Sequence, residues 1–194
     1  MTAFDPFKSR LCRNIRNELS ESLMDAIAGR NIGPSAIVAR KYGSEDAEPF
    51  IDRYIHDRLM RYQTIMDQIR SAHLQKNDTF MIALLLWDQE LFFEVHEWLE
   101  TKWRADKSAE KMISQALIRA AGVYVHLEHG RTDGARKMAL KAVAGLTRYK
   151  GLAPSYFNVE LLIEKLKTLD PVPPKLGALR LAVKSGRFKI EYDT

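Results

Sequence analysis

The chain has 194 residues, a formal net charge of +5 and a hydrophobic fraction of 46%. These values are those of a globular protein and exclude a chain that is disordered throughout. Positive and negative residues alternate along most of the sequence, which is typical of solvated helix faces and disfavours a nucleic-acid surface. The single cysteine, Cys12, excludes an intramolecular disulfide and a cysteine-rich zinc site, and it favours a reducing, cytoplasmic compartment.

The first third of the chain predicts an N-terminal helical extension over residues 1–76. Apolar residues recur at helical spacing from about Ser9 to Gly29. A short second helix is expected from its cap Ser35 to Tyr42, and a third from its cap Ser44 to about His73. The helix–glycine–helix order resembles a helix-turn-helix, but the acidic start of the third helix would be repelled by phosphates, so DNA binding is disfavoured.

Residues 77–170 predict a domain of antiparallel helices. The first of them, which contains the apolar run MIALLLW, is apolar nearly all round and should be central in the core. That run is too short to cross a bilayer, and the first residues of the chain lack an apolar signal segment, so no membrane association is expected. The expected helices begin near Asp78 or Thr79, near Leu91 and near Met112. Two more are expected to begin at their caps, one at Thr132 or Asp133 and one at Asn158.

Residues 171–194 predict a different kind of structure. Three prolines near their start force an extended segment. From Leu179 to Tyr192 apolar and polar residues alternate around a turn at Ser185-Gly186, which indicates either a small β-hairpin or an extended tail. Such a hairpin would pack on the body of the protein or on a second copy. The predicted fold class is therefore all-α: an antiparallel helical bundle with an N-terminal helical extension and an extended or hairpin C-terminal tail.

The stretch from Leu91 to Arg104 is the strongest candidate for a functional site. On a helix His96 and Glu100 point to one side, and Trp103 lies on that side one turn later. Glu94 and Glu97 lie off that face. A carboxylate buried among apolar groups needs a hydrogen bond, an ion pair or a metal. We interpret the two side chains either as a hydrogen-bonded pair in a structural or small-ligand pocket, or as two ligands of a divalent metal ion.

His126 is the best candidate for a third ligand, because Gly122 on the same helix would permit a neighbouring helix to come close. A nitrogen and oxygen ligand set does not distinguish zinc, iron, nickel or manganese. The zinc-protease pattern His-Glu-x-x-His fails at Glu100, and the Glu-x-x-His pairs of di-iron bundles are missing. The residues expected to complete the pocket are Phe92, Trp103, Gln115 and Tyr124.

The phrase FFEVHEWLETKW, from Phe92 to Trp103, resembles a bacterial and archaeal family known as domain of unknown function 309, which is marked by His-x-x-x-Glu-x-x-Trp/Tyr. A second phrase, with QALI from Gln115 and YVHL from Tyr124, also fits. The resemblance covers roughly Asp78 to Leu146. It implies an all-α domain and metal binding at the histidine and glutamate of the motif, His96 and Glu100, and it implies no reaction.

Two functions remain open at this point. The first is an uncharacterised helical protein whose buried His96/Glu100 pocket binds a divalent metal or a small ligand. The second is a helical protein-interaction module, in which the pair is structural and the partner binds to the tail or to the hairpin of helices around residues 114–149, which resembles one tetratricopeptide unit. A DNA-binding regulator is a third and weaker interpretation, and none of the three assigns an enzymatic reaction.

Overall fold

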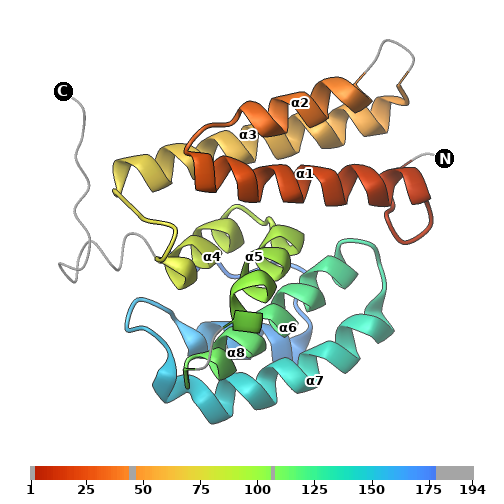
Figure 1. Ribbon diagram of the computed structural model, residues 1–194. Coiled ribbons are helices and arrows are strands. Elements are labelled where there is room, and N and C mark those ends of the chain that lie inside the picture. Colours follow the sequence, from red (N-terminus) through yellow and green to blue (C-terminus); the bar gives the residue numbers. More distant parts are fainter. Residues whose placement is uncertain (1–2, 44–46, 106–107, 178–194) are drawn as a thin grey trace. The chain divides into compact units, whose positions relative to one another are not determined.

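The computed structural model describes residues 3–43, 47–105 and 108–177. All regular secondary structure in these residues is helical, which confirms the predicted all-α class (Figure 1). The chain divides into two compact units, Met1–Arg70 and Ser71–Thr194. A compact unit is not yet shown to fold by itself, so the domain boundaries at residues 76/77 and 170/171 stay predictions.

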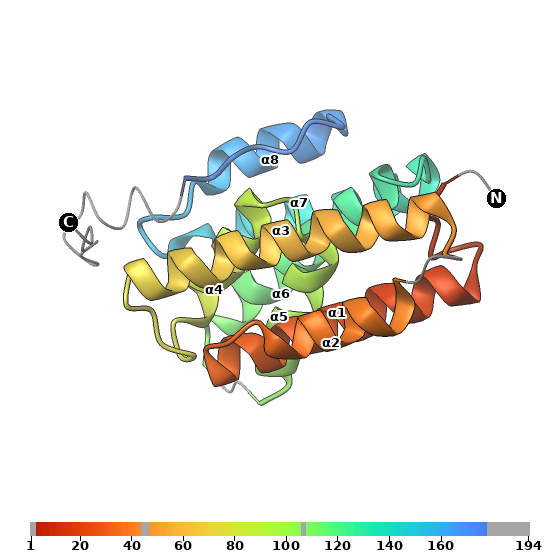
Figure 2. The ribbon, with the colours of Figure 1, turned by 90° about the horizontal axis from the view of Figure 1, so that it is seen from above.

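The first unit contains α1 (Arg10–Gly29), α2 (Gly33–Tyr42) and α3 (Pro49–Ser71). The cap of α1 is Ser9, and its side chain accepts a hydrogen bond from the backbone N–H of Cys12. Helices α1 and α2 lie side by side (Figures 1 and 2). The apolar stripe predicted for α1 is buried, including Ile15, Leu19 and Leu23.

Ser35 does not cap α2. The helix begins two residues earlier, with Pro34 in its first turn, where the missing N–H of proline costs little. Ser35 is fully buried, and its hydroxyl accepts a hydrogen bond from Ser22 at 3.0 Å, which links α2 to α1. The predicted cap Ser44 of the third helix lies outside the described residues.

The described residues of the second unit form five α-helices, which pack in the order of the sequence: each one contacts the next. Helices α6 and α7 form an antiparallel hairpin (Figure 1). A short 3-10 helix, η1, follows α7. The bounds are α4 (Thr79–Asp88), α5 (Phe92–Ala105), α6 (Lys111–Leu127), α7 (Thr132–Tyr149), η1 (Lys150–Leu152) and α8 (Val159–Thr168).

The ends of these helices test the predicted caps. Asn158 caps α8 as expected, since its side chain accepts a hydrogen bond from the N–H of Leu161. The expected caps Thr132 and Asp133 instead lie inside the first turn of α7, and Arg131 occupies the cap position.

Among the described helices, none combines the length and the apolar content that crossing a bilayer requires.

Helix α4 is central in the second unit, because all residues from Met81 to Trp87 are buried. The C-terminal end of α4 is hydrogen-bonded to the segment that follows α8. This segment runs back along α8 (Figure 2). The Trp87 indole N–H donates to the carbonyl of Pro174 at 2.9 Å. The Asp88 carboxylate accepts the N–H groups of Leu176 and Gly177 at 2.6 and 2.8 Å. We call these three hydrogen bonds the α4 clamp. The predicted tail hairpin lies beyond it, outside the described residues.

Candidate functional site

The helix that carries the His-x-x-x-Glu-x-x-Trp motif is separated from α4 by a short turn. Glu90 has a left-handed φ of 57°, and α5 starts two residues later. One side of α5 is apolar and buried, with Val95, Trp98 and Leu99 each at most 4% exposed. Trp98 is fixed further by its indole N–H, which donates to the carbonyl of Thr79. This packing holds the opposite side of α5 in a defined orientation.

His96 and Glu100 lie on that opposite side. Their side chains are 32% and 33% exposed, so the expectation of a buried pocket is wrong on this point. Each of the two follows a buried residue of α5, Val95 or Leu99, by one position. Consecutive side chains on a helix point about 100° apart, so His96 and Glu100 point away from the buried side. The two side chains are thus accessible to a solute while their backbone is fixed.

Three side chains of α5 converge at this place. The Nδ1 atom of His96 lies 3.2 Å from Oε1 of Glu97 and 3.8 Å from Oε2 of Glu100. One ligand atom from each residue lies within 4.8 Å of the others, which is close enough for one metal ion. We call His96, Glu97 and Glu100 the α5 cluster.

Arg104 completes the surroundings of the α5 cluster. Its guanidinium donates to Oε1 of Glu100 at 3.1 Å, one turn further along the helix. The other oxygen, Oε2, is the one that lies nearer to His96. Arg104 therefore leaves a carboxylate oxygen available to a metal ion and restricts the orientation of the carboxylate, as outer groups do in metal sites.

The sequence did not indicate Glu97 as a member of this site. Neighbouring residues on a helix point about 100° apart, and for this reason Glu97 was placed off the face of His96. Its long side chain bends back to the imidazole. The only feature of the sequence that could have indicated Glu97 is its residue type, since it is a flexible acidic residue next to a histidine. Glu94 was also placed off that face, but its complete burial was not foreseen.

The imidazole of His126 lies against α7, and not among the side chains of the α5 cluster as the sequence predicts. A Cβ atom on Gly134 of α7 would stand 2.6 Å from Nδ1 of His126, and one on Gly122 would stand 2.8 Å from the side chain of Met138, also on α7. The glycines therefore permit close approach between α6 and α7. The structure does not bring His126 into the α5 cluster, whose members among the described residues are all from α5.

Burial is the main influence on the His126 imidazole, and it lowers the pKa of this group below its ordinary value. The positive charge of Arg131 acts in the same direction. A neutral imidazole is the form that binds metals, and one side of this ring lies against Gly134 of α7. Its role as a third ligand stays a prediction.

Two of the four expected pocket residues belong to an aromatic core. Phe92 and Tyr124 stack with ring centroids 5.0 Å apart, and Trp87 meets both edge-on. All three are at most 2% exposed. Burial, followed by the negative charge of Asp170, raises the pKa of the Tyr124 phenol. These residues hold α4, α5 and α6 together.

The other two expected pocket residues lie in separate places. The ring of Trp103 is covered by the Lys111 ammonium, 4.4 Å from its centroid, so the aromatic residue of the motif joins the end of α5 to the start of α6. Gln115 lines a groove between α6 and α7. The structure thus distributes the four residues instead of gathering them around His96.

Residues 80–138 match a family model described as Domain of unknown function (DUF309), which confirms the resemblance noted in the sequence. The matched segment runs from the first turn of α4 into α7 and includes the whole α5 cluster. Neither the curated proteins nor the solved structures contained a match to this chain.

Proposed function

We propose that the motif helix, which lies within the segment that matches the domain of unknown function 309 model, binds a divalent metal ion through His96, Glu97 and Glu100. The observation that carries the proposal is the convergence of an imidazole nitrogen and two carboxylate oxygens within 4.8 Å. One nitrogen and two oxygens suit zinc and the other divalent transition metals.

The partial exposure of the cluster suggests an open site. Three protein ligands leave at least one position of a four-coordinate ion to water or to a small ligand. A bound ion in such a site lowers the pKa of its water and polarises a carbonyl or phosphoryl oxygen.

Metal titration of the full chain, purified without an affinity tag and freed of metal with a chelator, tests this function. We expect one Zn²⁺ per chain by calorimetry, with Ni²⁺ and Mn²⁺ compared in parallel. The variants Glu97→Gln and Glu100→Gln should each weaken binding at least tenfold, because an amide is a poorer ligand than a carboxylate. His96→Ala should abolish binding in the micromolar range.

The variant His126→Ala distinguishes two ligand sets. If the α5 cluster is the site, this variant binds zinc as tightly as the unmodified protein. If it loses as much affinity as His96→Ala, the set predicted from the sequence, His96, Glu100 and His126, is the correct one. Equal metal uptake by the unmodified protein and the His96→Ala variant would refute both. Circular dichroism checks that each variant keeps its helical content.

A further inference from the structure

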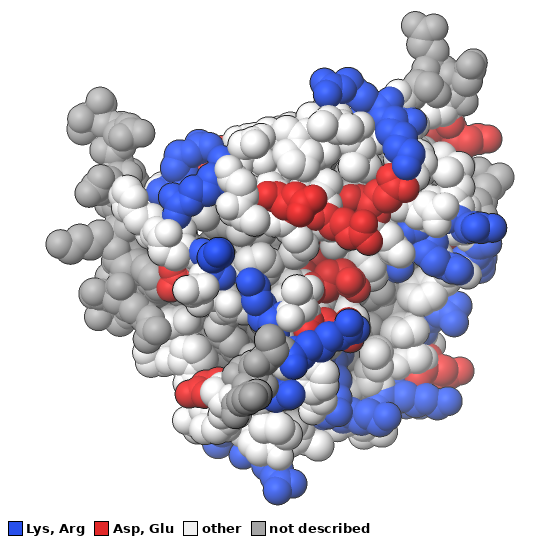
Figure 3. All heavy atoms as spheres, viewed as in Figure 1, with Lys and Arg blue, Asp and Glu red and all other residues white. Residues whose placement is uncertain are grey.

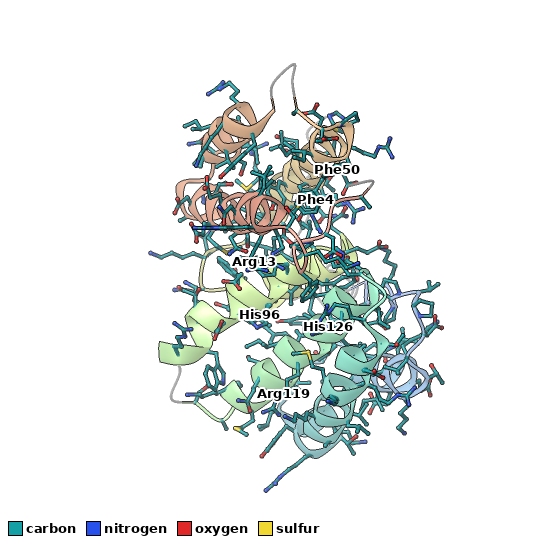
Figure 4. The ribbon with its side chains drawn as sticks, turned by 90° about the vertical axis from the view of Figure 1, so that its right-hand side faces the viewer. Phe4, Arg13, Phe50, His96, Arg119 and His126 are labelled. Atoms are coloured by element: carbon teal, nitrogen blue, oxygen red, sulfur yellow. The ribbon has the colours of Figure 1, made fainter. Side chains whose placement is uncertain are left out.

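A groove of about 360 Å³ runs between α6 and α7 on the second unit. Its polar lining comes from Gln115 and Arg119 on α6 and from Lys141 and Arg148 on α7, and Tyr149 stands at one end. We call it the α6/α7 groove. Residues of α5 do not contribute to it, and Arg119 lies apart from His96 in Figure 4, so the groove is separate from the α5 cluster.

Helix geometry explains why cations face each other across this groove. A Cβ on Gly145 of α7 would stand 3.0 Å from the Cβ of Ala116, so the two helices approach closely at its floor. Lys141 and Arg148 are seven residues apart, which places them on one face of α7. Gln115 and Arg119 are four apart and share a face of α6. The small residues Gly145 and Ala116 therefore lie at the floor of the groove, and the longer side chains of both helices form its sides.

The charges of the groove are not balanced. Its lining contains three cationic side chains and no acidic one. Within the described ranges, Arg119, Lys141 and Arg148 form no ion pair, whereas some cations elsewhere are paired with a carboxylate, such as Lys165 with Asp170 at 2.6 Å. Figure 3 shows blue side chains along the region of α7. Keeping three like charges together costs free energy unless an anion neutralises them.

We propose that the α6/α7 groove binds a small phosphomonoester through its phosphate group. Two guanidinium groups match the geometry of phosphate oxygens, and three positive charges offset a dianion. The volume is that of a small-molecule site rather than of a track for a polymer. Met112 and Tyr149, also in the lining, provide an apolar surface for the organic part of the ligand.

Phenyl phosphate is a suitable probe, because it combines a phosphate dianion with an apolar ring. Calorimetry with the full chain at physiological salt should give saturable binding of one molecule per chain. Lys141→Gln and Arg148→Gln each remove one exposed cation of the groove and should weaken binding about tenfold, the effect of losing one charge-assisted hydrogen bond. Arg136→Gln is the matched control: it removes the same charge from α7 but faces a different groove, beside α8.

The control should keep the affinity of the unmodified protein. Binding that does not saturate, or an equal loss in Arg136→Gln and Arg148→Gln, would overturn the proposal, since either result indicates general charge attraction. Inorganic phosphate should bind more weakly than phenyl phosphate; equal affinity would overturn the assignment to an organic ligand. Tighter binding of a short DNA duplex, lost in the same groove variants, would assign the groove to nucleic acid instead. Helical content measured by circular dichroism should be the same in all variants.

Discussion

His126 is held between two helices, with its ring against Gly134 and its carbonyl accepting the N–H of Arg131. Its imidazole has a pKa below the ordinary value of 6.5 in the folded protein, because of burial and then of Arg131. As the pH falls below 6.5, this imidazole binds a proton more readily in the unfolded chain than in the folded one. The contribution of His126 to stability is therefore present above pH 6.5 and is lost as the pH falls below it.

We expect His126→Gln to reduce this pH dependence. The free energy of unfolding, measured with urea at several values between pH 7.5 and pH 5, should fall less steeply for the variant than for the unmodified protein. His56→Gln, an exposed substitution on α3, is the control and should leave the slope unchanged. A slope that is the same with and without His126 would show that its protonation is equally favourable in both states.

At the level of single residues, the sequence predicted part of the α5 cluster. His96 and Glu100 are four apart on a helix, and this spacing alone brings them together. Glu97 was not predictable, since its participation depends on a side-chain rotamer and not on helical position. The surroundings of His126 were also out of reach, because Gly122 indicates a close approach without telling which helix approaches.

Among the elements, the α4 clamp is the feature with the clearest energetic consequence. The Asp88 carboxylate accepts two backbone N–H groups from the segment after α8. We expect Asp88→Ala to lower the free energy of unfolding by roughly 1–3 kcal/mol, the value of hydrogen bonds to a charged group in a partly exposed place. Amide hydrogen exchange at Leu176 and Gly177 should accelerate in the same variant.

Glu164→Ala is the control for the clamp, because it removes the same charge from an exposed position on α8. It should change stability by less than about 0.5 kcal/mol and leave the exchange of both amides as it is. If Asp88→Ala changes neither quantity, the two hydrogen bonds are replaced by water at no cost.

The sequence predicts which segments are helical better than it predicts the residue at which each helix begins. The apolar periodicity of α1 and the all-round apolar sequence of α4 gave the correct elements. Ser35 and Thr132 are good capping residues by type, yet both lie inside helices, because a preceding turn of backbone hydrogen bonds starts each helix earlier. No local sequence pattern indicates the α4 clamp, because each of its hydrogen bonds joins two residues that are 87, 88 or 89 positions apart in the chain.

For the whole molecule, the two units carry separate spectroscopic probes. The one thiol, Cys12, is 1% exposed in Met1–Arg70, and the three tryptophans all belong to Ser71–Thr194. Shorter units in general bury a smaller fraction of their surface, so we expect Met1–Arg70 to be the less stable of the two. In a urea titration we therefore expect Cys12 to react with a thiol reagent at lower concentrations than those that change the tryptophan fluorescence.

The comparison is made at equilibrium, with the thiol reagent added in brief pulses. A denatured sample provides the rate for a fully exposed thiol. Coincident midpoints for the two probes would contradict the expectation and show that the units unfold as one cooperative body.

The hydrogen bond from Trp87 to Pro174 also sets an order of events during synthesis of the chain. Closing a loop of 87 residues costs about 4 kcal/mol of chain entropy, whereas the α6–α7 hairpin forms from contacts near in sequence. The ribosome adds Pro174 87 residues after Trp87, when α4 to α8 have all been made. The hydrogen bond that fixes the end of α4 therefore cannot form until synthesis has passed the last of these helices.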